Sequence, residues 1–135
     1  MMRTLVALVF FALVWQSCTK QNDTTPAPSN QVSGTWKITS LIDNKNRDRT
    51  SRYSSYSFDF LDSGALQVKQ GTAIVKTGTW SNSSSYWTAA IVIVIGGVAT
   101  EDDLAELNED WRILEKTDTV IKVQNGGGKV LIFGR

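Results

Sequence analysis

The sequence predicts an all-β fold, a small antiparallel up-and-down β-barrel of about eight strands. Apolar and polar side chains alternate in short runs such as Trp36 to Ile42 and Tyr56 to Phe60, which is the period of a strand with one buried face. The breaks between runs are short and rich in Gly, Asn, Asp and Ser, which favours hairpins between consecutive strands. The pattern shows no long crossover, and closing the sheet into a barrel would remove its exposed edges.

Residues 1–17 have the pattern of an export signal. Arg3 supplies the charged start, Leu5 to Trp15 form an apolar stretch too short to span a bilayer, and Ser17 is a small residue at the cleavage point. Cys18 is the only cysteine in the chain and follows directly. This arrangement resembles a bacterial lipoprotein signal peptide, and the resemblance implies a mature chain that begins with a diacylated Cys18. Soluble secretion is the alternative, and the bulky Trp15 fits its cleavage rule poorly.

Residues 18–31 are predicted to be a disordered tether, because the polar stretch with Pro26 and Pro28 has almost no apolar side chains to bury. At ~3.3 Å per residue it could hold the folded domain, residues 32–135, up to roughly 40 Å from the anchor. Thr19 follows the cysteine in place of the aspartate that signals inner-membrane retention in some bacteria. We therefore expect an exported protein that is lipid-anchored in the cell envelope, with the outer membrane preferred.

Six further strands are predicted after the two with clear alternation. They are Leu66–Lys69, Ala73–Trp80, Trp87–Ile95, Trp111–Leu114, Val120–Val123 and Val130–Phe133. The predicted turns are Asp62–Gly64, Gln70–Gly71, Asn82–Ser85, Lys116–Asp118 and Asn125–Gly128. Asp103–Leu107 is the one plausible helical turn. Ala89 to Ile95 is apolar on both faces, so it is either a central strand covered by a neighbour or an aggregation hazard of the unfolded chain.

Gly34-Thr35-Trp36 resembles the Gly-x-Trp motif that opens the first strand of lipocalins and fatty-acid-binding barrels, a calycin-type arrangement. In those families the Trp closes one end of the barrel, often against an Arg from near the chain end. The resemblance implies Arg135 as that partner, with Arg112 as second choice. Gly78-Thr79-Trp80 repeats the tripeptide, and the layout is similar to the lipocalin-like domains of small bacterial lipoproteins. The alternative is that both Trp residues simply fill a core.

The residue inventory argues against catalysis. The chain has no histidine, the commonest general base and metal ligand, and its one cysteine is predicted to carry lipid. Asp59 and Asp62 lie on opposite faces or across a turn, and Gly126 to Gly128 lack the Lys-Ser/Thr pair of a phosphate loop. Acidic and basic residues balance once Arg3 is removed with the signal. We therefore expect no enzymatic activity, no cofactor, no metal site and no nucleic-acid partner.

Two segments carry opposite charge. Lys45, Arg47, Arg49 and Arg52 lie in a predicted loop from Asp43 to Arg52, whereas Glu101 to Asp110 has six acidic residues and no basic one. If the strands run up and down in order, both loops and the Gly126–Gly128 turn lie at the end of the barrel away from the tether. The two loops could then close a lid over the barrel mouth. The alternative is two solvated loops that never touch.

The sequence favours a non-catalytic binding module that takes a small apolar ligand. The candidate ligand-lining residues are Trp36, Tyr56, Phe58, Trp80 and Trp111. The alternative is a structural or protein-interaction module on the envelope with a filled barrel, and the number of bulky inward side chains favours it. The expected partners are the membrane, through the lipid anchor, and either a small apolar ligand or an envelope protein. An apolar void of a few hundred Å³ would favour the ligand, and a filled interior the interaction module.

Overall fold

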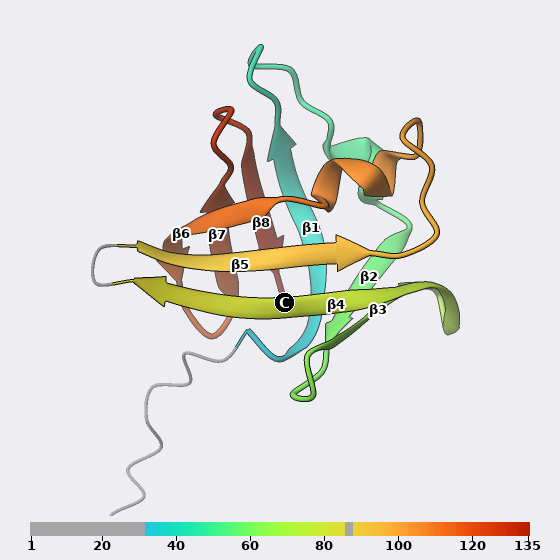
Figure 1. The fold of residues 1–135 in the computed structure, drawn as a ribbon. Coiled ribbons are helices and arrows are strands. Elements are labelled where there is room, and N and C mark those ends of the chain that lie inside the picture. The colour runs from blue at the N-terminus through green and yellow to red at the C-terminus, as the bar shows by residue number, and fades with distance from the viewer. Residues whose placement is uncertain (1–31, 86–87) are drawn as a thin grey trace, which may run out of the picture.

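The computed structural model describes residues 32–85 and 88–135, and the predicted signal peptide, Cys18 and the tether lie outside these ranges. Eight antiparallel strands pair in sequence order, and β1 pairs with β8 to close the barrel (Figure 1). The strands are β1 (Gly34–Ile42), β2 (Tyr56–Phe60), β3 (Ala65–Gln70), β4 (Ala73–Ser85), β5 (Thr88–Ile95), β6 (Asp110–Lys116), β7 (Val120–Gln124) and β8 (Val130–Gly134). The predicted fold class is confirmed.

Two short 3₁₀ helices interrupt the connections, η1 (Thr50–Tyr53) after β1 and η2 (Asp103–Leu107) after β5. η2 is the predicted helical turn, whereas η1 was not expected. Among the described residues, no helix combines the length and hydrophobicity needed to cross a bilayer.

The predicted turn at residues 82–85 is wrong, because β4 continues through it to Ser85. Asn82 pairs with Ile91 and Ser83 with Ala90. The polar residues of β4 are thus held as a strand by their ladder with the apolar β5, which outweighs their low intrinsic β-propensity. Trp87, which the prediction placed at the start of the next strand, lies outside the described residues.

The inward side chains of seven strands form one buried hydrophobic cluster, and β4 adds the half-buried Trp80. Aromatic rings pack against one another at its centre. Phe133 lies edge-on to Phe58 and to Phe60, with ring centroids 5.9 and 5.6 Å apart, and Trp80 lies edge-on to Phe60 at 5.7 Å. These are the distances of direct ring contact, so the middle of the barrel is occupied by its own side chains.

One end of the barrel is closed by Trp36 and the last residue, Arg135. The Arg135 guanidinium lies 4.1 Å above the centre of the Trp36 ring, and its Nη1 donates to the Ser33 carbonyl at 3.0 Å. Gly34 is required here, since its φ is +123° and a Cβ would lie 2.3 Å from Arg135 Nη1. The expected partner of Trp36 is therefore confirmed, while Arg112 instead donates to Gln124 on the outer surface.

The opposite end is closed by side chains from the two longest connections. Tyr53 of η1 and Leu104 and Leu107 of η2 are buried and belong to the same hydrophobic cluster. Figure 1 shows the two helices next to each other above the strand ends. The indole Nε1 of Trp111 donates to the Leu107 carbonyl at 3.0 Å and ties η2 to the start of β6.

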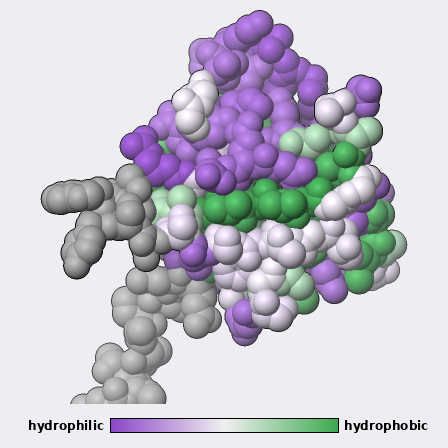
Figure 2. Space-filling view, viewed as in Figure 1, coloured by the Kyte–Doolittle hydropathy of each residue, from purple (hydrophilic) through white to green (hydrophobic). Residues whose placement is uncertain are grey.

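The outer face of β5 is not covered by another element. Ile91, Ile93 and Ile95 point inward and are buried, whereas Val94 on the other face is 51% exposed. Figure 2 shows a hydrophobic band over β5, in contrast to the hydrophilic loops at the η1 and η2 end of the barrel. The strand is central in the sheet, between β4 and β6, but only one of its faces is buried.

Candidate functional site

The five predicted ligand-lining residues line none of the three hollows described below. Trp36, Phe58 and Trp111 are buried in the core, and Tyr56 and Trp80 are partly buried and packed against it. Three hollows of about 480, 540 and 380 Å³ open to solvent on the outside, and none of these three is lined by any of the five. The spacing of these aromatic residues in the sequence says nothing about whether space remains between them.

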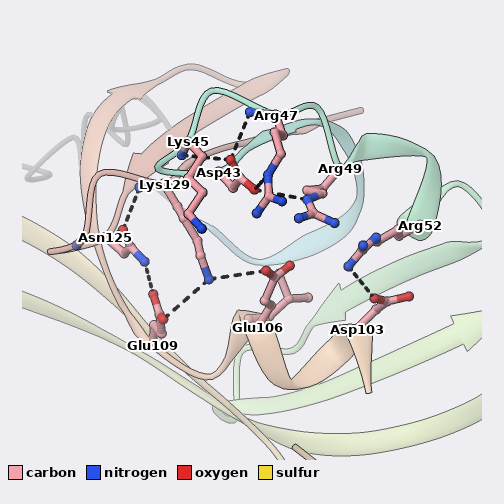
Figure 3. Close-up of polar contacts among 12 residues, drawn as sticks. Asp43, Lys45, Arg47, Arg49, Arg52, Asp103, Glu106, Glu109, Asn125 and Lys129 are labelled. Carbon is pink, nitrogen blue, oxygen red and sulfur yellow. Dashed lines mark hydrogen bonds and ion pairs between the residues drawn. The ribbon is translucent and has the colours of Figure 1, made fainter. Parts of the chain in front are cut away.

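The polar surface is concentrated at the end of the barrel that η1 and η2 close. We call this end the rim, and define it by residues 43–55, 96–110 and 125–129. Arg52 Nη1 lies 3.0 Å from Asp103 Oδ1, and Lys129 Nζ lies 3.4 Å from Glu106 Oε1 (Figure 3). The basic loop, the acidic segment and the glycine turn therefore share one end, as predicted, and the alternative of two loops that never touch is excluded.

Asp43 organises the basic loop from the inside. Its side chain is 4% exposed, and Oδ1 accepts the backbone N–H groups of Lys45 and Arg47, both at 2.9 Å. Oδ2 accepts the Nε–H groups of Arg47 at 2.8 Å and Arg49 at 3.1 Å. The backbone bond from Arg47, with those from Lys45 and the two guanidinium groups, holds the pKa of Asp43 well below its usual range against the effect of burial.

The sequence predicted the charge of this loop but not the role of Asp43. An Asp whose carboxylate accepts a hydrogen bond from the backbone N–H two residues ahead forms an Asx-turn. The sequence Asp43-Asn44-Lys45-Asn46 favours such a turn. Asn46 has the left-handed φ of 59° that Asn tolerates. The turn signal was therefore present, but the carboxylate's additional bonds to two guanidinium groups are a property of the folded loop.

The contact between the basic loop and the acidic segment is made by Arg52 and Tyr53. The Tyr53 hydroxyl lies 2.7 Å from the Asp103 carbonyl and 3.0 Å from Glu106 Oε2, and it donates to this pair of acceptors. Burial, and then the charge of Glu106, raise the pKa of Tyr53 well above its usual range. The exposed Arg52–Asp103 pair adds at most ~1 kcal/mol, so the buried Tyr53 ring contributes more to holding the two loops together.

The β7–β8 turn is shaped by Asn125. Its Oδ1 accepts the N–H groups of Gly127 at 3.1 Å and Lys129 at 2.8 Å, and its Nδ2 donates to Glu109. Gly128 has a φ of +92°, which favours glycine at this position. The predicted hairpin turn is confirmed, and it is tied by Asn125 to the acidic segment.

A polar hollow of about 540 Å³ lies where the three parts of the rim meet. It is lined by Asn44, Glu109, Asp110, Asn125, Gly126, Gly127 and Lys129. A second hollow of about 480 Å³ continues along the outer wall and shares Asp110, Asn125 and Gly126 with the first. We call the two together the rim groove. Its amide, carboxylate and ammonium groups suit a polar partner and are unlike the apolar lining typical of a hydrophobic-ligand pocket.

The described residues contain no group of three His, Cys, Asp or Glu side chains placed to hold a metal ion. Asp59, one of the two carboxylates considered above, lies on the barrel wall and accepts from Lys69 Nζ at 2.5 Å and the Thr35 hydroxyl at 2.7 Å. Partial burial raises its pKa, but the bonds from Lys69 and Thr35 outweigh this and leave it lowered, which suits a structural carboxylate.

The chain matches no protein-family model and no curated protein. It is similar in structure to an uncharacterized protein from Bacteroides eggerthii DSM 20697, for which a crystal structure is known. The two share 10% sequence identity with a TM-score of 0.51, and the match covers 78% of this chain and 100% of that chain. A likeness at this identity shows a shared fold alone.

Proposed function

We propose that this chain is a non-catalytic, lipocalin-like interaction module that is anchored in the cell envelope through Cys18 and binds a partner protein at the rim. The observation that carries this proposal is the filled interior. Tyr53, Leu104 and Leu107 close the mouth, and Trp36 with Arg135 closes the other end. A barrel filled by its own side chains leaves its loops as the surface where binding residues usually lie.

A small apolar ligand inside the barrel is the second candidate function. It is supported by the five aromatic residues and by the likeness of Gly34-Thr35-Trp36 to the lipocalin motif. Such a ligand would have to displace rings that already pack at 5.6 to 5.9 Å from one another. Packing of this density resists insertion, because added volume in a filled core forces strained rotamers and backbone shifts.

The position of the rim supports the proposal further. The described residues begin at Val32, which is buried at the end of the barrel that Trp36 closes. The rim lies at the opposite end. A tether joined to Val32 would therefore attach the domain by the end away from the rim. A partner would meet the charged loops on the side that faces away from the membrane.

Site-specific photo-crosslinking in the native envelope tests this proposal. A photoreactive residue in place of Asn44 in the rim groove should give a discrete adduct of reproducible mass. The same residue in place of Lys37, which is exposed on the barrel wall, should give none. Adducts from Lys37 alone would contradict the rim as the docking surface.

Titration with a dansyl-labelled fatty acid separates the two candidate functions. A filled barrel predicts no saturable increase in dansyl fluorescence. Saturable one-to-one binding that is lost on Phe58→Trp, which adds volume to the core, would support an internal ligand site and contradict the proposal.

A further inference from the structure

Arg47 and Arg49 carry hydrogen-bond donors that the described residues leave unused. Each guanidinium donates to Asp43 Oδ2 through Nε only, at 2.8 and 3.1 Å. Their Nη groups make no hydrogen bond or ion pair in the described part of the chain. One carboxylate oxygen therefore accepts from both Nε–H groups, and Figure 3 shows both side chains gathered around Asp43.

The loop around this pair has an excess of positive charge. Residues 43–49 carry three basic side chains, Lys45, Arg47 and Arg49, against the two carboxylates of Asp43 and Asp48, and the Lys45 amine makes no hydrogen bond or ion pair in the described residues. The other nearby carboxylate, Asp48, accepts the N–H and hydroxyl of Thr50 within its own turn. Arg49 is only 20% exposed, so part of its charge is held where water screens it weakly.

A carboxylate is the anion that fits this position best. The outer edge of a guanidinium binds a planar carboxylate with two parallel hydrogen bonds. The acidic segment also lies across the rim, with Glu106 and Glu109 around Lys129. A doubly charged phosphate would be repelled by these groups more strongly than a single carboxylate.

The mixed charge of the rim indicates a protein segment as the source of that carboxylate. Beside the arginine pair, the rim groove offers the side chain of Asp110, which makes no hydrogen bond or ion pair in the described residues, and the amide of Asn44. A segment that carries an acidic side chain followed by a basic or amide side chain would match both regions. A uniformly anionic surface would match only one of them.

We infer that Arg47 and Arg49 are the anchor of the rim, and that they bind the carboxylate of an Asp or Glu side chain on the partner protein. The inference rests on the proposed function, because it names the chemistry by which the rim would hold its partner. Asp43 then acts as a positioning residue that orients both guanidinium groups before the partner arrives.

NMR titration of the arginine Nε–H signals tests this assignment. We expect the blocked peptide acetyl-Glu-Gly-Glu-amide to shift the Nε–H signals of Arg47 and Arg49 saturably. The neutral peptide acetyl-Gln-Gly-Gln-amide should leave them unchanged at the same concentration. An equal response to both peptides, or tighter binding of inorganic phosphate than of the acidic peptide, would overturn the inference.

Three variants separate the anchor from diffuse electrostatics. Arg47→Lys keeps the charge but loses the paired donors. Lys45→Gln removes an amine that makes no hydrogen bond or ion pair in the described residues. Each variant should weaken peptide binding by about three-fold or more. Lys37→Gln, the same charge change on the barrel wall, should not. If Arg47→Lys disturbs the loop, seen as altered backbone N–H signals of residues 45 and 47, Lys45→Gln carries the test. Equal weakening by Lys45→Gln and Lys37→Gln would contradict the inference.

The crosslinking experiment distinguishes this failure from failure of the proposed function. Loss of the Asn44 adduct in the Arg47→Lys and Lys45→Gln variants supports the anchor. An unchanged adduct in both variants contradicts the anchor but leaves the rim as the docking surface.

Discussion

Two buried tryptophans make the same kind of hydrogen bond at opposite ends of the barrel. Trp36 Nε1 donates to the Val32 carbonyl at 2.6 Å, and Trp111 Nε1 donates to the Leu107 carbonyl at 3.0 Å. In both cases the acceptor lies four residues earlier, in the segment that leads into the strand. A buried indole needs an acceptor, and here the acceptor is the backbone that the ring must hold in place.

Replacing Trp36 by Ala should lower the free energy of unfolding by ~3–5 kcal/mol, because a large buried ring, its hydrogen bond and its contact with Arg135 are lost together. Tyr56→Ala, at a partly buried position on the same wall, should cost clearly less. Denaturant unfolding of the two variants measures the difference. Equal midpoints would show that Trp36 is not the closing residue.

Asp43→Asn should change how stability depends on pH. The folded-state pKa of Asp43 is lowered, so its carboxylate contributes stability above the unfolded-state value of about 3.9, and this contribution is lost as pH falls towards the folded pKa. The variant should melt at a lower temperature at pH 7 and lose less stability than the parent between pH 5 and pH 2.

The control for this experiment is Asp110→Asn, since the Asp110 side chain makes no hydrogen bond or ion pair in the described residues. Thermal unfolding at several pH values gives the comparison. If both variants lose the same stability as the parent between pH 5 and pH 2, the network around Asp43 does not stabilise the fold.

At the level of elements, the two Gly-Thr-Trp sequences show how one tripeptide serves two different contacts. In β1, Gly34 makes room for Arg135 above Trp36. In β4, Gly78 lets β5 approach, since a Cβ there would lie 2.0 Å from the Val94 carbonyl oxygen. Trp80 then packs on Phe60 and donates to the Leu61 carbonyl at 2.8 Å. The repeat therefore marks two close contacts of different kinds, one with the Arg135 side chain and one with the backbone of β5.

Gly78→Ala should destabilise the β4–β5 pair by about 2 kcal/mol, the usual cost of forcing extra volume into a filled contact. The expected result is a lower melting temperature with an unchanged circular dichroism spectrum below the transition. Gly126→Ala is the matched control, because a Cβ at Gly126 meets nothing within 4 Å. Equal melting temperatures for the two variants would contradict the close approach of the strands.

For the whole molecule, closure of the barrel separates two ends that are built from different residues. The hairpin order puts the turns after β2, β4 and β6 at the end that Arg135 closes, and Arg135 Nε donates to the Asp118 carbonyl at 2.6 Å there. The connections after β1, β5 and β7 form the rim. The even number of strands returns the chain to its starting end, so Ser33 and Arg135 lie together at the end opposite the rim.

Cys18→Ser should release the protein from the membrane fraction while leaving the domain folded. The expected acyl chains supply the membrane affinity, and Cys18 precedes the described domain in sequence. Fractionation of cells, with near-ultraviolet circular dichroism of the released protein, checks both parts. A variant that sediments with membranes as fully as the parent would contradict the lipid anchor.

The sequence by itself determined the class and order of the elements. Alternation in β1 and β2, turn residues after β2 and β7, and the short acidic helix η2 all follow from patterns within a few residues. The shared end of residues 52 and 103 also followed, because hairpins in sequence order permit only one arrangement of their ends.

Only the tertiary structure decided whether the interior is filled and which charged side chains pair with one another. The continuation of β4 to Ser85, the closing of the mouth by Tyr53 and the capture of Arg47 and Arg49 by Asp43 depend on partners that the local pattern does not specify. Whether aromatic side chains leave a cavity depends on how their volumes meet across a closed barrel. Sequence spacing predicts which residues face inward. The space that remains between them depends on the side-chain volumes contributed by all eight strands.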